Sequence, residues 1–259
     1  MADIRDRGVL RVGLPQGFPP FSSGPAQRPR GFLVDMARYI GSLLDVRVEY
    51  SMAPMEEMPH LANRQKVDVA YSAQAVTGKL LAHYPVGTPY FVVHQRLLVR
   101  KSSGISDVRD VNGKRLCTSI QPSTEIRLET IGVRPASDVE APIHRCLRLM
   151  AKGEVDVVTA ADAKLLAGVA AHPEWTITGD ELTTEGYGVI GAPPTKEGGR
   201  GWIAFLDRAL YYFKDTGRWM RSYDRHVAPL VDRPLDEPPH MSAGDAAALY
   251  PELIPLEKE

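Results

Sequence analysis

Four ionisable side chains lie in segments that we expect to face a ligand-binding cleft: Lys79, Glu125, Asp162 and Lys164. Amines and carboxylates of this kind act as general acids and bases. If the chain is an enzyme, these residues are its candidate acid–base groups.

Signatures of the common catalytic and metal sites are absent from the sequence. It contains no G-x-S-x-G, no phosphate-binding G-x-x-x-x-G-K-[ST] and no H-E-x-x-H motif. No two of the seven histidines have the spacing of a metal-binding helix, so we predict neither a metal site nor a cofactor. The sequence therefore favours a binding site over a reaction centre.

Polar and aromatic residues follow two predicted strands in the first third of the chain. These strands cover residues 9–14 and 66–71. Ligands of open α/β sheets bind at the carboxyl ends of the strands. The candidate ligand-binding residues at these ends are Gln16, Phe18, Phe21, Tyr71, Gln74 and Ala75. We expect Phe21 to pack against the ligand.

A third polar loop, residues 120–125, follows a predicted strand at residues 113–119. Ser123 or Thr124 fits the N-cap of a helix, whose free N–H groups suit an anionic ligand. An ordinary helix cap explains the same residues.

The predicted elements alternate between strands and amphipathic helices, as in an α/β fold. Residues 32–44 have apolar side chains at helical spacing, and further helices are predicted at 143–152, 161–171, 202–215 and 218–226. The strand-like segments 66–71 and 154–159 share the sequence Val-Asp-Val. Two similar lobes explain this short sequence repeat better than one continuous sheet does.

Composition places limits on partners and location. The 259 residues are 44% hydrophobic and 24% charged, with a formal net charge of −1, which excludes nucleic acid or an anionic membrane as the main partner. No apolar run reaches the roughly 20 residues of a spanning helix. The first seven residues lack the apolar segment of a signal peptide, so the sequence as written predicts a cytoplasmic protein. It would be extracellular or at the cell surface if a leader had been removed.

Two cysteines, Cys117 and Cys146, are too few for a disulfide scaffold or a four-cysteine metal site. They are either two small buried hydrophobic residues or one disulfide.

Taken in order, the segments resemble those of the extracellular solute-binding proteins of family 3, which deliver polar amino acids to ABC importers. The matching segments are GVLRVG (8–13), PFS (20–22), GFLVDMA (31–37), VDV (67–69), VT (76–77), PY (89–90), ST (123–124), GEVDVV (153–158) and YGV (187–189). The resemblance implies the type II periplasmic-binding-protein fold, in which two α/β lobes joined by two hinge-crossing strands close on a ligand. Lobe 1 would comprise residues 1–97 and 189–230, lobe 2 residues 98–188, and a proline-rich tail residues 231–259.

The second lobe looks most like that of actinobacterial glutamate-binding proteins, which carry cysteines at the positions of Cys117 and Cys146. That similarity implies a disulfide if the protein works outside the cytosol. The family also implies a monomer that binds a small polar or anionic metabolite and meets an ABC permease or a sensor partner. Ser123 and Thr124 would contact the ligand from the second lobe.

Two departures from the family pattern concern the groups that hold an α-amino acid. The arginine that clamps the α-carboxylate is replaced by Leu80, with Lys79 beside it. The aspartate that holds the α-ammonium is replaced by Ala161, with Asp162 one residue later. We therefore expect a ligand other than a standard α-amino acid in the usual pose, with Lys79 and Asp162 among its contacts.

Two other functions fit the same scaffold. Cyclohexadienyl dehydratases resemble these binding proteins, which implies as an alternative a cytosolic lyase, dehydratase or isomerase that needs no cofactor. The position of the dehydratases' catalytic glutamate is Lys164 here, so that particular activity is not supported. The third hypothesis is a protein that binds a partner protein through its proline-rich tail and binds no small molecule.

Overall fold

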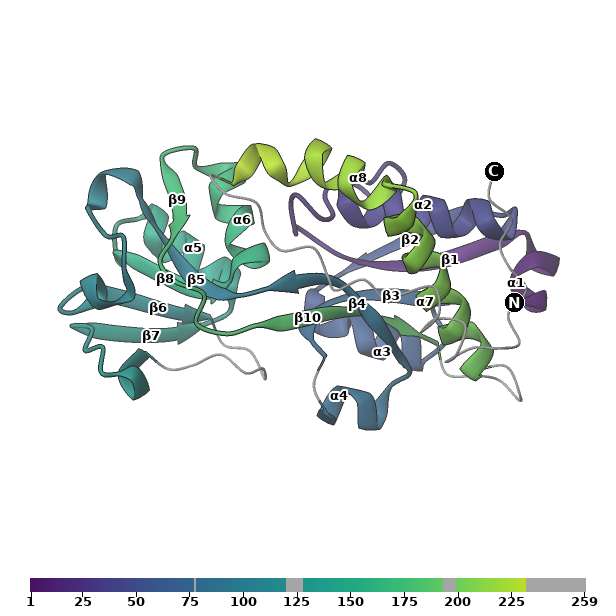
Figure 1. The fold of residues 1–259 in the computed structure, drawn as a ribbon, viewed down its shortest axis with the longest axis horizontal. Coiled ribbons are helices and arrows are strands. Elements are labelled where there is room, and N and C mark those ends of the chain that lie inside the picture. Colours follow the sequence, from purple (N-terminus) through teal and green to yellow (C-terminus); the bar gives the residue numbers. More distant parts are fainter. Residues whose placement is uncertain (77, 120–127, 193–198, 232–259) are drawn as a thin grey trace.

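Two five-stranded sheets organise the computed structural model, which describes residues 1–76, 78–119, 128–192 and 199–231 (Figure 1). The first has the order β2-β1-β3-β10-β4, with β1 at Val9–Pro15, β2 at Arg47–Ala53, β3 at Val69–Ala75, β4 at Val86–Val93 and β10 at Glu185–Gly191. The second has the order β7-β6-β8-β5-β9, with β5 at Gln95–Arg100, β6 at Arg115–Ser119, β7 at Ser137–Ala141, β8 at Val157–Ala161 and β9 at Trp175–Thr178. In each sheet three strands run parallel, and the strands that enter from the other lobe pair antiparallel to them.

Helices cover the faces of both sheets. Lobe 1 carries α1 at Ala2–Arg7, α2 at Phe32–Leu44, α3 at Met58–Asn63, α4 at Gly78–His83, α7 at Gly199–Asp215 and α8 at Arg218–His226, with 3₁₀ turns at Met55–Glu57 and Ala228–Leu230. Lobe 2 carries α5 at Ile143–Ala151 and α6 at Asp162–Ala171, with 3₁₀ turns at Lys101–Ser103, Val108–Val111 and Leu128–Ile131. In α2 the apolar side chains recur every three or four residues, which is why one face of this helix is buried.

The chain passes between the lobes at two places. His94 alone separates β4 of the first sheet from β5 of the second, and the return lies between Thr178 of β9 and Glu185 of β10. Residues 97–100 belong to the second sheet and residues 186–191 to the first. Polar residues interrupt the apolar pattern at both crossings, His94 at the first and Asp180 and Glu181 at the second.

The largest hydrophobic core lies in lobe 1, between its sheet and helices α2, α7 and α8. It also includes three side chains of lobe 2 at the end of β8 and in α6, namely Ala161, Ala163 and Leu166. Figure 1 shows why: α8 and the turn after it extend along the top of lobe 1 toward α6. Lobe 2 has two smaller cores.

The repeated Val-Asp-Val sequence forms the same arginine clamp in each lobe. In lobe 1 the Asp68 carboxylate accepts hydrogen bonds from the Arg11 backbone N–H (2.8 Å) and from Arg11 Nη2 (2.7 Å). In lobe 2 the Asp156 carboxylate accepts the corresponding bonds from Arg115, at 3.0 Å and 2.6 Å. Each aspartate therefore ties the start of one strand to its parallel neighbour, a structural role.

The clamp in lobe 2 predicts a specific loss of stability in acid. The hydrogen bond from Arg115 is the main cause that lowers the pKa of Asp156 from 3.8 to about 2. Because the pKa is lower in the folded state, this contribution is complete above pH ~4 and is lost as the pH falls to about 2. Asp156→Asn should cost about 1 kcal/mol of unfolding free energy at pH 5, a modest value because the carboxylate is one-third exposed, and much less at pH 2.

Urea unfolding at both pH values measures this change. Glu154→Gln, which alters an exposed carboxylate two residues away, is the matched control and should show no such pH dependence. A cost for Asp156→Asn that is equal at both pH values would contradict the prediction.

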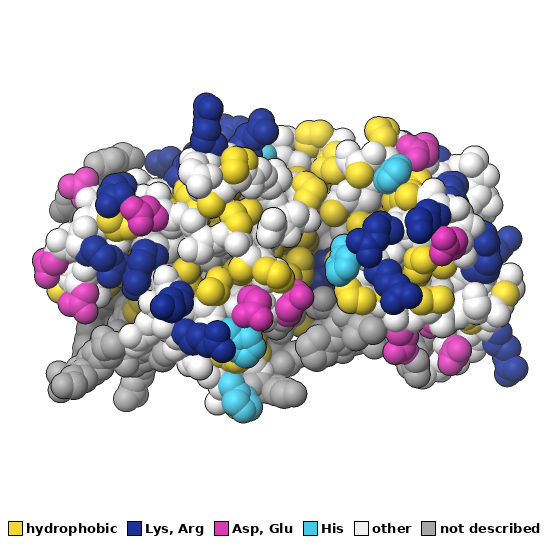
Figure 2. Space-filling model, turned by 180° about the vertical axis from the view of Figure 1, so that it is seen from behind, with side chains coloured by type: hydrophobic (Ala, Val, Ile, Leu, Met, Phe, Trp, Pro, Cys, Tyr) yellow, Lys and Arg dark blue, Asp and Glu magenta, His cyan; other side chains and the backbone are white. Residues whose placement is uncertain are grey.

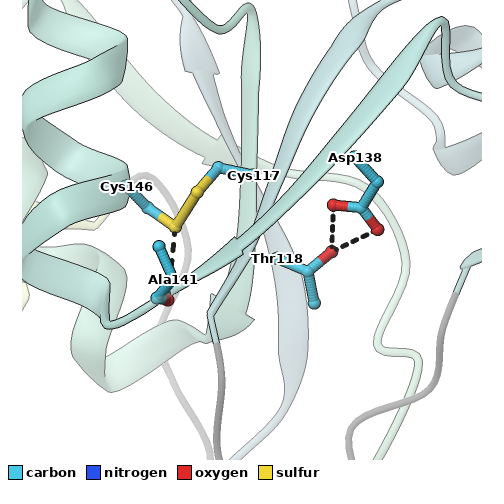
Figure 3. Close-up of a disulfide and its surroundings, with 5 residues drawn as sticks. All are labelled: Cys117, Thr118, Asp138, Ala141 and Cys146. Atoms are coloured by element: carbon cyan, nitrogen blue, oxygen red, sulfur yellow. Dashed lines mark hydrogen bonds between the residues drawn. A yellow bond between two sulfur atoms is a disulfide. The ribbon is translucent and has the colours of Figure 1, made fainter.

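Cys117 in β6 and Cys146 in α5 are joined by a disulfide, which links the sheet of lobe 2 to the helix that covers it (Figure 3). The Sγ of Cys146 lies 3.5 Å from the Ala141 carbonyl oxygen, a van der Waals contact because a disulfide sulfur has no hydrogen to donate. On the next residue, the Thr118 hydroxyl lies 2.9 Å from both carboxylate oxygens of Asp138. Both links join elements of lobe 2.

Candidate functional site

The carboxyl ends of the parallel strands in both lobes point toward the boundary between the lobes (Figure 1). The residue that follows each of these strands therefore lies at this boundary. In α/β proteins, ligands bind outside the carboxyl ends of strands and at domain interfaces. The inter-lobe boundary is therefore the candidate binding site.

The aromatic loop after β1 turns its rings into lobe 1. Phe21 has no exposed surface, and its ring centroid lies 4.8 Å from Phe18, 5.0 Å from Phe91 and 6.0 Å from Phe32. Phe18 is also buried, whereas Gln16 is exposed. In place of the expected ligand contact, the Phe21 ring is part of the core.

The start of α2 explains why this loop folds inward. The carbonyl groups of Pro20 and Phe21 accept the N–H groups of Phe32 and Leu33, which open the helix. Gly31 makes the approach possible, because it has a φ of 130° and a Cβ at this position would lie 2.4 Å from the Phe21 carbonyl oxygen. The loop therefore caps α2.

At the end of β3, Tyr71 and Ala75 are buried side chains. The Tyr71 ring packs edge-on against Tyr90, and burial raises the pKa of its phenol well above the ordinary value. Gln74 is a β3 residue and Lys79 an α4 residue, but their side chains lie outside the described part of the structure. Leu80, at the position of the family arginine, is 8% exposed and belongs to a small apolar core with Met58 and Ile190.

The loop after β6 comprises residues 120–127, which the structure does not describe. Ser123, Thr124 and Glu125 lie outside the described residues. The predicted contact between this loop and a ligand stays a prediction.

Asp162 is the first residue of α6, at the carboxyl end of β8, and it is completely buried. Its backbone N–H donates to the His94 carbonyl oxygen, and its Oδ1 accepts a 2.7 Å bond from the Ala163 N–H. Its Oδ2 has no hydrogen-bond partner among the described residues. Burial raises the pKa of Asp162 to about 6, and backbone hydrogen bonds at His94 and Ala163 oppose that rise.

Lys164, two residues along α6, is 2% exposed. Its ammonium lies 5.8 Å from the centre of the Tyr187 ring in β10, a cation–π contact between the lobes. Asp162 and Lys164, two of the four predicted acid–base residues, are therefore both buried at the start of α6. Among the described residues, no group of three His, Cys, Asp or Glu side chains could hold a metal ion.

Two hinge residues were not singled out by sequence reasoning. The buried His94 places its Nδ1 2.8 Å from the Thr183 carbonyl oxygen of the return crossing. Gln95 adds a second link, because its backbone N–H donates to the Thr183 hydroxyl. These bonds tie the two crossings together, and a polar residue between two apolar strands was the signal that could have located them.

The face opposite the view of Figure 1 carries cations and anions over both lobes (Figure 2). On this face the described Lys and Arg side chains are interspersed with Asp and Glu. This mixture agrees with the formal net charge of −1. In the described residues, every helix is too short or too polar to cross a bilayer.

Comparison with known proteins explains the two-lobed architecture. The family model of the bacterial extracellular solute-binding proteins, family 3, matches residues 10–229. The chain belongs to this family. Its fold is the type II periplasmic-binding-protein fold seen in an arginine-binding protein, ArgBP from T. maritima, with a TM-score of 0.70 at 24% identity over 88% of this chain and 98% of that one.

Relatives of this family 3 protein differ in the function that their names describe. The glutamate-binding protein GluB of Corynebacterium glutamicum is 24% identical over 78% of this chain and 74% of its own length. The L-cystine-binding protein TcyJ of Escherichia coli is 27% identical over 44% of each chain. The membrane-bound lytic murein transglycosylase F of Aeromonas salmonicida is 27% identical over 68% of this chain, which spans only 36% of that protein.

Proposed function

We propose that this family 3 protein closes its two lobes on a small polar molecule that is not a standard α-amino acid held in the usual pose. The observation that carries the proposal is the pair of short crossings, at His94 and between Thr178 and Glu185, that join two complete sheets. Two adjacent crossings of this kind permit hinge closure around a ligand. The apolar burial of Leu80 supports a departure from the usual pose, because a leucine offers no charge to a carboxylate.

Capture of a ligand from a metabolite mixture tests this function. We expect native mass spectrometry to recover one small molecule bound and chemically unchanged. Because a ligand that binds only the folded state stabilises it, saturation at 100 times Kd should add about 2.7 kcal/mol to the unfolding free energy. Retention of no small molecule, with no thermal shift, would contradict the proposal.

An enzyme on the same scaffold is the second candidate. Asp162 and Lys164 are both buried in the first turn of α6, and a carboxyl group whose pKa is about 6 suits general acid–base catalysis near neutral pH. In the same capture experiment an enzyme would convert the molecule. A change of mass between the added and the recovered compound would favour this candidate.

We further propose that the protein works in an oxidising compartment and presents its ligand to an ABC permease or a sensor protein. The Cys117–Cys146 disulfide supports the location, because structural disulfides persist mainly outside the reducing cytosol. Its relatives include a protein named as the ABC transporter glutamine-binding protein GlnH of Bacillus subtilis, 23% identical over 88% of this chain, which supports a transporter partner.

A further inference from the structure

A single buried imidazole forms the first crossing between the lobes. His94 is 4% exposed and separates β4 from β5. Its Nδ1 lies 2.8 Å from the Thr183 carbonyl oxygen and 3.3 Å from the Thr184 hydroxyl, both in the return crossing. Because a carbonyl oxygen can only accept, Nδ1 carries the hydrogen and donates it to Thr183. The imidazole therefore links one crossing directly to the other.

Further hydrogen bonds surround this link. The Gln95 backbone N–H donates to the Thr183 hydroxyl at 3.1 Å, and the Leu182 N–H donates to the Gln95 carbonyl oxygen at 3.0 Å. The Asp162 N–H donates to the His94 carbonyl oxygen at 2.8 Å, which attaches the start of α6 to the same residue. A rotation of one sheet against the other changes the backbone angles of the two crossings, so it acts on these bonds first.

Three carboxyl groups lie around the imidazole. Glu181, in the return crossing, places its Oε2 3.9 Å from His94 Nδ1. The carboxyl of Asp162, in α6, interacts electrostatically with His94. Glu185 is buried at the start of β10, where it pairs with Val93, the residue before His94. A positive charge on the imidazole would be attracted by all three.

Two cations complete the charged groups in this part of the described structure. Arg96 also acts on the Asp162 carboxyl, and its Nε donates to the Gly179 carbonyl oxygen at 3.2 Å. Lys164 lies over the Tyr187 ring. Three carboxyl groups against two cations leave room for one more positive charge, and imidazole is the side chain whose charge changes between pH 5 and 8.

We propose that His94 is a proton-controlled link in the hinge: its protonation strengthens the bond to Thr183 and holds the two crossings in the arrangement seen here. A charged donor makes a hydrogen bond about twice as strong as a neutral one does. The hinge should therefore be stiffer in acid than at pH 8. The inference rests on the proposed hinge closure but not on the identity of the ligand.

The titration of Asp162 acts in the opposite direction. Burial raises the pKa of Asp162 to about 6, so this carboxyl loses its negative charge over the same pH range. Its attraction for a protonated imidazole then weakens. Glu181, whose side chain is 41% exposed, is therefore the main partner of the charged form.

Hydrogen exchange of the full chain without ligand tests the inference. Exchange at pH 5 and pH 8, corrected for the intrinsic effect of pH, is followed by mass spectrometry in peptides that cover residues 94–97 and 179–186. Protection there should be about fivefold higher at pH 5, the factor that separates a charged from a neutral hydrogen bond. Peptides that cover β6, away from the crossings, are the internal reference and should show no such difference. Equal protection of the crossings at both pH values would overturn the inference.

Substitutions identify the group that titrates. His94→Asn keeps an N–H donor near the position of Nδ1 but cannot gain a proton, so its protection should not change with pH. His172→Asn is the matched control, because His172 also faces a carboxylate of lobe 2, that of Glu174 at 3.1 Å, and it should keep the wild-type response. A His94→Asn protein that responds to pH as the wild type does would overturn the inference.

Glu181→Gln provides a second test that leaves the buried surface intact. It removes the carboxylate 3.9 Å from the imidazole and should reduce the difference between pH 5 and pH 8. If His94→Asn does not fold, an unchanged difference in Glu181→Gln overturns the inference. No ligand takes part in these measurements, so the metabolite capture decides the proposed function separately.

Discussion

Replacing Phe21 by alanine is expected to lower the unfolding free energy by about 3 to 5 kcal/mol. The side chain is completely buried and touches three other aromatic rings, so its removal leaves a cavity that the surrounding rings cannot close. For a chain of this length the melting temperature should drop by roughly 10 °C. Calorimetry and urea unfolding measure the two quantities.

Phe21→Leu is the matched control, because it keeps most of the apolar volume and should cost about 1.5 kcal/mol or less. The comparison also separates a core residue from a ligand contact. If Phe21→Ala instead left stability nearly unchanged and weakened ligand affinity, the ring would be a ligand contact, as the sequence predicted.

Loss of the disulfide should have the second large effect. Cys117 and Cys146 are separated by 29 positions, and closing a loop of that size in the unfolded chain corresponds to about 3.6 kcal/mol of stability. The double variant Cys117→Ser, Cys146→Ser should therefore unfold at lower urea concentration. Reduction of the wild-type protein should produce a similar loss.

The double variant is also the control for the reductant, which should not change its stability. If reduction leaves the wild-type unfolding curve unchanged as well, the disulfide does not contribute to stability. A free-thiol assay of the unfolded, unreduced protein would show whether the bond had formed.

Strongly periodic segments could be predicted from the sequence almost to the residue. Helices α2 and α8 begin and end where their patterns indicated. Strands β4 and β7 were missed for physical reasons. The first contains Gly87 and Pro89, which are unfavourable in strands, and the second is a short polar strand at a sheet edge.

The candidate site was predicted less completely than the fold. The sequence placed Phe21 correctly in the loop after β1, but the direction of its ring depends on carbonyl groups that cap α2 across Gly31. That contact cannot be inferred from apolar spacing. Asp162 was located because it follows a strand, while the importance of His94 appears only once both crossings are seen together.

The side chains of α6 that pack into the core of lobe 1 restrict how the two halves can separate. Ala163 and Leu166 contact the same apolar cluster as the end of α8 and the turn that follows it. Separating the two lobes fully would expose these apolar contacts to water, at an unfavourable free energy proportional to the apolar area exposed. These contacts would therefore restrict the proposed opening of the two lobes to a rotation of limited amplitude about the edge where α6 meets α8.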